Sequence, residues 1–398
     1  MTAAPVALYV HVPFCVSLCP YCDFVVYAGA AARGPRNRVA AFLGALESEL
    51  ELRADALGES AGSVPLETVY FGGGTPSLLP PETVARLLER ARARFGLRAG
   101  AEVTLEANPG FDERGDARSW REAGITRLSF GAQSLDAGEL RSLGRRHAPE
   151  DVAAAIEEAR AAGIGSISLD LLYDVPSSTE AAWAATLDAA LALRPDHLSL
   201  YALTLDDPDA EGITGPNGDH LPTTSGARRW RDRARPQQDD ERAAAQYGHA
   251  VERLAADGWH GYEISNWARL GHESRHNLVY WERRPYEAIG PGAHAFDGES
   301  RRWNAARLDG YVAALSDPTP GLPPGGGERL DPDIAAAETV ILALRTDRGV
   351  SEVTAHEPPL DNVAPWAVTT GLLAREGDRL VLTTRGRLLS NELFARLL

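Results

Sequence analysis

Three cysteines within eight residues are the part of this sequence best suited to chemistry. Cys15, Cys19 and Cys22 are its complete set of cysteines, and the other positions of the 398-residue chain hold none. An odd number of clustered thiols does not fit a disulfide framework and favours metal or redox chemistry. We therefore expect this loop to carry a metal centre or a reactive dithiol.

Four kinds of site compete for these thiols. A structural zinc site usually pairs two Cys or His hooks about a dozen or more residues apart, and a second hook is absent. Covalent haem attachment needs His directly after the second cysteine of the pair, where Asp23 stands. Cys19-Pro-Tyr-Cys22 resembles a glutaredoxin-type dithiol but leaves Cys15 unexplained. Three thiolates can also hold three irons of a 4Fe-4S cluster and leave the fourth iron open to a ligand.

Six repeats of a short strand and a longer amphipathic helix are expected to position this loop. The predicted strands are 7–12, 68–71, 102–106, 127–130, 166–170 and 197–201. The predicted helices between them are 39–57, 81–95, 113–123, 150–162 and 179–193. Because right-handed crossovers allow few connections, the pattern predicts an α/β fold with a partial (β/α)6 barrel. An open doubly wound sheet is the alternative.

Polar residues and glycines stand where the predicted strands end. Gly72-Gly-Gly-Thr-Pro76 follows the second strand, Glu106 ends the third, Gln133 follows the fourth and Asp170 ends the fifth. Barrel sites are built at this end, and glycine backbone lets a ligand approach closely. Each polar residue alone would suit a helix cap, but their recurrence favours one ligand site.

The cysteine spacing, with the aromatic Tyr21 before the last cysteine, resembles the signature of the radical SAM superfamily. In that superfamily the open iron of a 4Fe-4S cluster is chelated by S-adenosylmethionine (SAM). One electron then cleaves the sulfonium to a 5′-deoxyadenosyl radical. The resemblance implies a radical SAM barrel with a cluster on Cys15, Cys19 and Cys22. It also implies that the glycine-rich segment contacts the methionine end of SAM.

Over about residues 6–300 the chain resembles the oxygen-independent coproporphyrinogen III oxidases and their relatives. This resemblance implies that SAM is bound by Tyr9, Tyr21, Gly73, Gly74, Thr75, Glu106, Gln133, Arg145 and Asp170.

Two features resemble the haem chaperones of this group more than the true oxidases. The oxidases carry a further cysteine two residues beyond the third, where this chain has Phe24. Residues 275–281 match a His-Asn-x-x-Tyr-Trp motif associated with haem binding, which implies haem contacts by His276, Asn277, Tyr280 and Trp281. Imidazole commonly ligates haem iron, and aromatic rings pack on porphyrins. The alternative is a purely structural role, as a packed loop with an Asn turn.

Composition excludes several classes of protein. The 40 basic and 56 acidic residues give a net charge of −16, which opposes attraction to nucleic-acid phosphates. All basic residues are Arg, so Schiff-base and Lys-base mechanisms are excluded. No run approaches the ~20 apolar residues of a membrane span, and the N-terminal segment lacks a basic secretory n-region. We expect a cytoplasmic protein that is not integral to a membrane.

The chain is expected to divide into two domains. Residues 1–315 form the barrel domain with a haem-motif extension at about 260–300, the Pro- and Gly-rich residues 316–332 form a linker, and 333–398 form a small winged-helix-like domain. A helix at 240–257 and a strand at 260–264 are also predicted. Residues 206–235, which end in an Arg-rich run, suit a surface lid or a partner site equally well.

The resemblance implies a haem chaperone that binds haem and a SAM-ligated cluster and passes haem to an acceptor haem protein, membrane-associated or not. SAM cleavage would need an electron donor, and no catalytic residue is assigned. The main alternative is oxidative decarboxylation of coproporphyrinogen III by hydrogen abstraction. A third hypothesis is a hydrogen-abstracting tailoring or methyl-transfer enzyme of the same subfamily. It would assign no function to the motif at residues 276–281.

Overall fold

Six parallel strands form the centre of the fold. They pair in chain order and are β1 (Ala7–Val12), β4 (Leu66–Gly73), β5 (Leu97–Ala107), β6 (Arg127–Gln133), β7 (Ser166–Tyr173) and β8 (His197–Ala202). The computed structural model describes residues 3–29, 37–205 and 212–398. A doubly wound sheet would reverse its strand order, which this run does not. The predicted partial (β/α)6 barrel is confirmed, and within the described ranges the sheet stays open.

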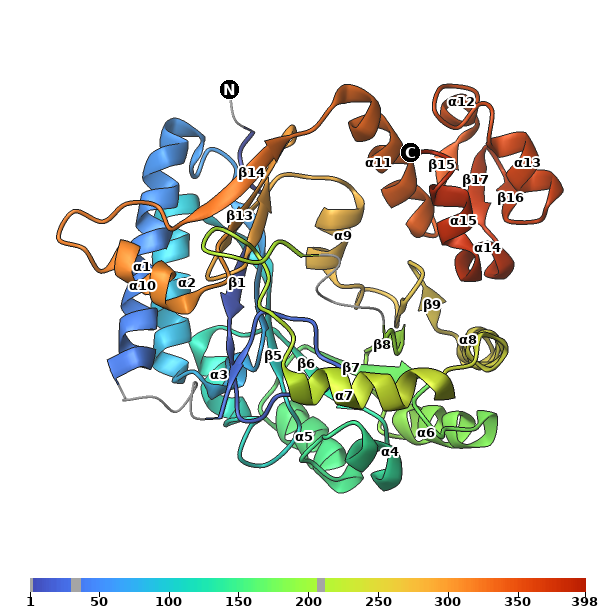
Figure 1. Ribbon diagram of the computed structural model, residues 1–398, viewed down its shortest axis with the longest axis horizontal. Coiled ribbons are helices and arrows are strands. Elements are labelled where there is room, and N and C mark those ends of the chain that lie inside the picture. Colours follow the sequence, from blue (N-terminus) through green and yellow to red (C-terminus); the bar gives the residue numbers. More distant parts are fainter. Residues whose placement is uncertain (1–2, 30–36, 206–211) are drawn as a thin grey trace.

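Helices cover the outer face of these strands, as Figure 1 shows. They are α1 (Asn37–Leu57), α2 (Pro81–Phe95), α3 (Ala117–Ala123), α4 (Ala137–Ser142), α5 (Pro149–Ala161), α6 (Glu180–Ala192) and α8 (Asp240–Ala256). Phe42 of α1, Leu87 of α2 and Leu187 of α6 join strand residues such as Leu105 and Leu169 in the main apolar core. Because side chains of a strand alternate between faces, the inner face is left for other residues.

Shorter strands extend the sheet at both edges. Beyond β1 lie β11 (Tyr286–Ile289), β12 (His294–Phe296), β13 (Ser300–Asn304) and β14 (Gly325–Arg329), and beyond β8 lie β10 (Asn266–Ala268) and β9 (His260–Gly261). β11 runs parallel to β1, and the other edge pairings are antiparallel. A separate ribbon pairs β2 (Phe14–Cys15) with β3 (Tyr27–Ala28).

The predicted linker at 316–332 is wrong where β14 lies within it. Residues Gly325–Arg329 pair with β13 instead of forming a free connection. A Cβ atom on Gly325 would lie 1.9 Å from the carbonyl oxygen of Trp303. The glycine therefore allows β13 and β14 to approach each other closely. Composition alone does not distinguish this role from that of a flexible linker.

The C-terminal part has a core of its own. It contains a three-stranded antiparallel sheet, β15-β17-β16, and an apolar cluster that includes Leu344, Leu360, Leu380 and Leu393. Its elements are α11 (Pro332–Arg345), β15 (Val350–Ser351), α12 (Glu352–Ala355), α13 (Ala364–Thr369), β16 (Leu373–Glu376), β17 (Arg379–Leu382), α14 (Thr384–Leu388) and α15 (Ser390–Phe394). The domain division and the winged-helix-like assignment stay predictions.

Three more helices are α7 (Ser225–Ala234), α9 (Arg275–Trp281) and α10 (Leu308–Leu315), of which α10 packs against α1 (Figure 1). Of the segment at 206–235, residues 206–211 lie outside the described residues. In the part of the chain that the structure describes, no helix is long and apolar enough to cross a membrane.

Candidate functional site

A cavity of about 400 Å³ lies on the inner side of the parallel strands. Alternate strand residues line it: Thr104 and Glu106 on β5, Arg127 and Ser129 on β6, Ser168 and Asp170 on β7, and His197 and Ser199 on β8. The interior of a barrel is normally filled by branched apolar side chains. A polar inner face therefore indicates a place for ligands. Sequence reasoning found only the residues near the strand ends, although the polar alternation within the strands was a readable signal.

The three cysteines line this cavity after the end of β1. They are unpaired and half-buried, and the Cys22 N–H donates to the Cys19 carbonyl oxygen at 3.1 Å. Thr75 Oγ1 lies 3.5 Å from the Cys15 sulfur, and Arg145 Nη1 lies 3.5 Å from the Cys19 sulfur. Burial raises the pKa of Cys15 to about 11 and that of Cys22 to about 12.

These thiols fit an iron–sulfur cluster better than the alternatives. Among the described residues, no group of three or more His, Cys, Asp or Glu is placed around a single metal ion. A 4Fe-4S cluster spreads its thiolates over several irons and does not need that compact arrangement. A reactive dithiol would use only Cys19 and Cys22 and would leave Cys15, which lines the same cavity, without a role. Metal coordination deprotonates a thiol outright.

The glycine-rich segment after β4 brings its backbone against the cysteine loop. The Gly74 and Thr75 N–H groups donate to the carbonyl oxygens of Val12 and Phe14 at 2.8 and 2.7 Å. Gly73 has a φ of +109°, and a Cβ atom there would lie 2.5 Å from the His11 ring. This close packing requires glycine and leaves the segment facing the cavity.

Two half-buried carboxyl groups face the cavity from β5 and β7. Glu106 accepts hydrogen bonds from the Tyr70 hydroxyl at 2.7 Å and from the Gly73 N–H at 2.9 Å. Asp170 accepts one from Ser129 Oγ at 3.2 Å. Burial raises the pKa of Glu106 to about 7 and that of Asp170 to about 6. A cationic ligand group would restore the ionised form of both.

Arg145 and Gln133 reach the same cavity from the β6 side. Arg145 Nη2 donates to the Gly131 carbonyl oxygen at 2.6 Å and to Asn108 Oδ1. Gln133 has a φ of +66°, where the β6–β7 register shifts. Asn108 was not predicted as a site residue. Its Nδ2 donates to Thr75 Oγ1 at 3.1 Å, so it links the glycine-rich segment to Arg145.

The two predicted SAM tyrosines differ in position. Tyr21 lines the cavity, and its ring centroid lies 6.3 Å from that of Trp230. Tyr9 is absent from the cavity lining; its hydroxyl is 3.0 Å from His11 Nδ1 and its ring stacks on Tyr70 at 6.1 Å. Tyr9 therefore supports the site through Tyr70.

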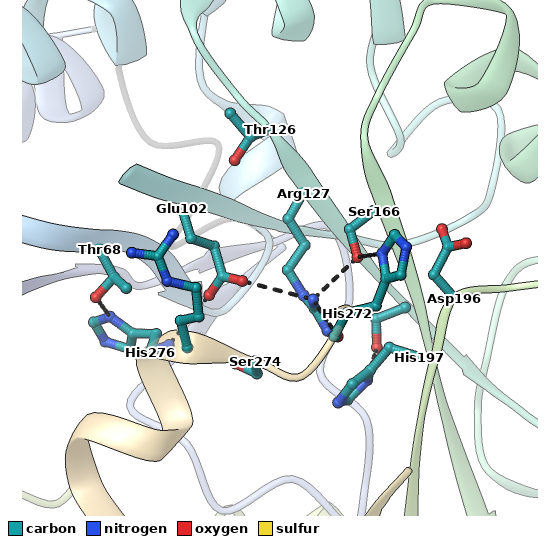
Figure 2. A network of polar contacts seen from close by, with 12 residues as sticks. Thr68, Glu102, Thr126, Arg127, Ser166, Asp196, His197, His272, Ser274 and His276 are labelled. Atoms are coloured by element: carbon teal, nitrogen blue, oxygen red, sulfur yellow. Dashed lines mark hydrogen bonds and ion pairs between the residues drawn. The ribbon is translucent and has the colours of Figure 1, made fainter. Parts of the chain in front are cut away.

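The predicted haem motif forms helix α9, not a loop. Its His276 lies beside Thr68, near the start of β4, whereas the cysteines follow the end of β1; Figure 2 shows His276 with Thr68 and Glu102. Both ring nitrogens are engaged, Nδ1 by Thr68 Oγ1 at 2.7 Å and Nε2 by the Tyr280 hydroxyl at 2.8 Å. The side chain is buried, and burial lowers its pKa to about 3, so the imidazole is neutral.

The four motif residues do not share one surface. Asn277 lines the barrel cavity, whereas Trp281 packs under the Arg345 guanidinium at 4.5 Å. Tyr280 contacts the His276 ring edge to face at 5.1 Å. Ligation of haem iron by His276 would therefore require one of its two hydrogen bonds to break.

Known proteins resemble this chain over its whole length. The Heme chaperone HemW of Mycobacterium tuberculosis strain H37Rv is 38% identical over 398 residues, which cover 100% of this chain and 96% of that protein. The Heme chaperone HemW of Bacillus subtilis is 31% identical and covers 98% of each. That of Escherichia coli is 36% identical over 73% of this chain and 70% of its own length.

Fold comparison agrees with the sequence comparisons. The model of the radical SAM superfamily matches residues 9–190. The structure of coproporphyrinogen III oxidase (HemN) from Escherichia coli superposes with a TM-score of 0.78 at 24% identity, over 99% of this chain and 90% of that one, which shows a common fold. The chain belongs to the HemW family of the radical SAM superfamily, whose cofactors are a 4Fe-4S cluster and SAM.

Proposed function

We propose that this protein is a cytoplasmic haem chaperone that binds haem and passes it to an acceptor haem protein. The supporting observation is its end-to-end similarity to proteins named Heme chaperone HemW. Phe24 is consistent with this role. It stands where the oxidases carry a further cysteine, lines the cavity and is 68% exposed. The acceptor, at a membrane or in solution, would take haem directly from this protein.

We assign the cluster to Cys15, Cys19 and Cys22, with SAM on its open iron. Bound together, the two supply one-electron cleavage of the SAM sulfonium once a donor reduces the cluster. The Arg145 guanidinium beside Cys19 would offset thiolate charge. SAM contacts are assigned to Tyr21, Gly73, Gly74, Thr75, Glu106, Gln133, Arg145 and Asp170, all of which line the cavity. Tyr9 would act indirectly through Tyr70.

We assign haem to the α9 end of the barrel, with His276 as the iron ligand. The neutral imidazole is the form that ligates iron. Its Nε2 partner, Tyr280, lies one helical turn further along the same helix, so exchange of the hydroxyl for iron needs a local rearrangement.

A hemin titration of the anaerobically cluster-reconstituted full chain, followed at the Soret band, tests the proposal. Saturable, near-stoichiometric uptake by the wild type is expected. His276→Ala should lose it, whereas His356→Ala, an exposed histidine of the C-terminal part, should not. Uptake retained by His276→Ala would support the haem-carrier function but show that another residue ligates the haem iron. Absence of specific uptake would remove the carrier function and make coproporphyrinogen III the next compound to test.

A further inference from the structure

The inner end of the cavity, near the start of the strands, holds two polar atoms without hydrogen-bond partners. They are Thr104 Oγ1 and Arg127 Nη2, each unpaired among the described residues. Both side chains line the cavity and are nearly inaccessible, with Thr104 1% and Arg127 3% exposed. Thr104 and Arg127 are direct register partners on the adjacent parallel strands β5 and β6. The two side chains therefore enter the cavity from neighbouring strands at the same level.

The other half of the Arg127 guanidinium is held firmly. Nη1 donates to Ser166 Oγ at 3.0 Å and to the His272 carbonyl oxygen at 2.9 Å, and it lies 3.6 Å from the Glu102 carboxylate. Figure 2 shows Arg127 between Glu102 and Ser166. A charged donor fixed on one side and unpaired on the other destabilises the folded state unless a ligand accepts its hydrogen bond.

The polar neighbours of this pair are already satisfied. Ser168 Oγ contacts His197 Nδ1 at 2.8 Å, and His197 Nε2 contacts the Tyr262 hydroxyl at 2.8 Å. Burial keeps His197 neutral by lowering its pKa. The groups left to a ligand are thus a hydroxyl and a guanidinium N–H, both donors. A carboxylate, with two acceptor oxygens, matches two donors that enter one cavity from adjacent strands and of which one is cationic.

This pair lies on the strand-start side of the proposed SAM contacts, in the same cavity. Arg127 begins β6 and Gln133 ends it, which corresponds to about 20 Å of strand. By contrast, Glu106, the nearest proposed SAM contact on β5, lies two residues or about 7 Å beyond Thr104 on the same face. The inner end is bordered by Ser274 and Asn277, at the start of α9. The whole cavity, about 400 Å³, is within the range of small-molecule sites.

We propose that Thr104 and Arg127 form a carboxylate subsite at the inner end of the barrel cavity. Two sources can supply this chemistry: a free small carboxylate, or a propionate of the haem that we assign to α9. The second source rests on the proposed function, and the first does not. Asn277, at the border of the subsite, would contact this ligand and not the porphyrin face.

Binding experiments on the cluster-reconstituted full chain separate the two sources. Calorimetry with sodium propionate and sodium glutarate, each compared with its amide, probes the free carboxylate. Hemin compared with hemin dimethyl ester probes the propionate. In at least one arm the acid should bind about tenfold or more tightly than its neutral counterpart. Equal affinities in both arms would overturn the subsite and leave the chaperone proposal intact. If hemin does not bind but a free carboxylate shows the acid preference, the result would count only against the chaperone proposal.

The variant Thr104→Val provides the sharpest test, because it removes an unpaired hydroxyl. Ligand-free Thr104→Val should melt no lower than the wild type, while its acid-over-neutral preference should fall about tenfold. Arg127→Met should lose the preference altogether. Thr186→Val, a buried threonine of α6 outside the cavity lining, and Arg98→Met, an exposed arginine, are the matched controls. A preference unchanged in Thr104→Val would reject the assignment even if Arg127→Met fails to fold.

Discussion

Arg231 forms an ion pair with Asp23, which ties helix α7 to the residue directly after the third cysteine. Arg231 also donates to the Tyr21 carbonyl oxygen at 2.8 Å, and its side chain is 3% exposed. Trp230 of the same helix lies against Tyr21 and donates to the Ser142 carbonyl oxygen at 3.0 Å. The sequence alone left a surface lid and a partner site equally open for this segment. These contacts make α7 a strap, that is, a helix packed over the cysteine loop.

We predict that Arg231→Met loosens the cysteine loop. The variant loses charge-assisted hydrogen bonds to Tyr21 and Asp23, so the free energy of unfolding should fall by about 2 kcal/mol. Iron and acid-labile sulfide content after reconstitution should fall as well. Arg233→Met changes an exposed arginine of the same helix and should affect neither quantity. Full iron content in Arg231→Met would show that the loop holds its shape without the strap.

The pH dependence of the free energy of unfolding should reveal the ionisation of the Glu106 carboxyl group. Its ordinary pKa is 4.5, whereas burial raises the native value to about 7. Between these values the native state binds more protons than the unfolded state, so this carboxyl lowers the free energy of unfolding as the pH rises from about 4.5 to 7. The free energy of unfolding of Glu106→Gln, relative to that of the wild type, should therefore rise by about 2 kcal/mol from pH 5 to pH 8. Urea unfolding of both proteins without cofactors measures it.

Two comparisons make this measurement specific. Glu157→Gln, at an exposed position of α5, should track the wild type at both pH values. Addition of SAM to reconstituted wild-type protein should reduce the loss of stability at pH 8, because a bound cation favours the ionised carboxylate. A constant difference between Glu106→Gln and the wild type across pH 5 to 8 would mean that Glu106 is ionised throughout.

Sequence patterns predicted the parts of the fold that carry long, continuous signals. The six parallel strands are bounded by amphipathic helices, and the cysteines sit at the expected strand end. Strands β11 to β14 were missed because they are three to five residues long and β11 pairs with the distant β1. Thr104 and Arg127 were missed because polar residues inside a strand are also typical of a solvent-facing side.

Gly325 offers a test of the corrected linker. A flexible linker would tolerate Gly325→Ala, but the added Cβ would meet the Trp303 carbonyl oxygen at 1.9 Å. The variant should therefore separate β13 from β14 locally and lower the free energy of unfolding by about 2 kcal/mol. Gly321→Ala, where a Cβ would meet nothing within 4 Å, should behave as the wild type in thermal unfolding. Equal melting temperatures for the two variants would restore the linker interpretation.

The His276–Tyr280 hydrogen bond provides the last prediction. Tyr280→Phe removes the hydroxyl that occupies His276 Nε2 and keeps the ring that packs against the imidazole. The free energy of unfolding should fall by about 1 kcal/mol. If His276 ligates haem iron, the freed nitrogen should bind hemin more tightly, because the wild type must first break this bond. Tyr286→Phe is the matched control, since Tyr286 packs against Tyr280 without contacting His276. Weaker hemin binding by Tyr280→Phe alone would instead make the Tyr280 hydroxyl a direct haem contact.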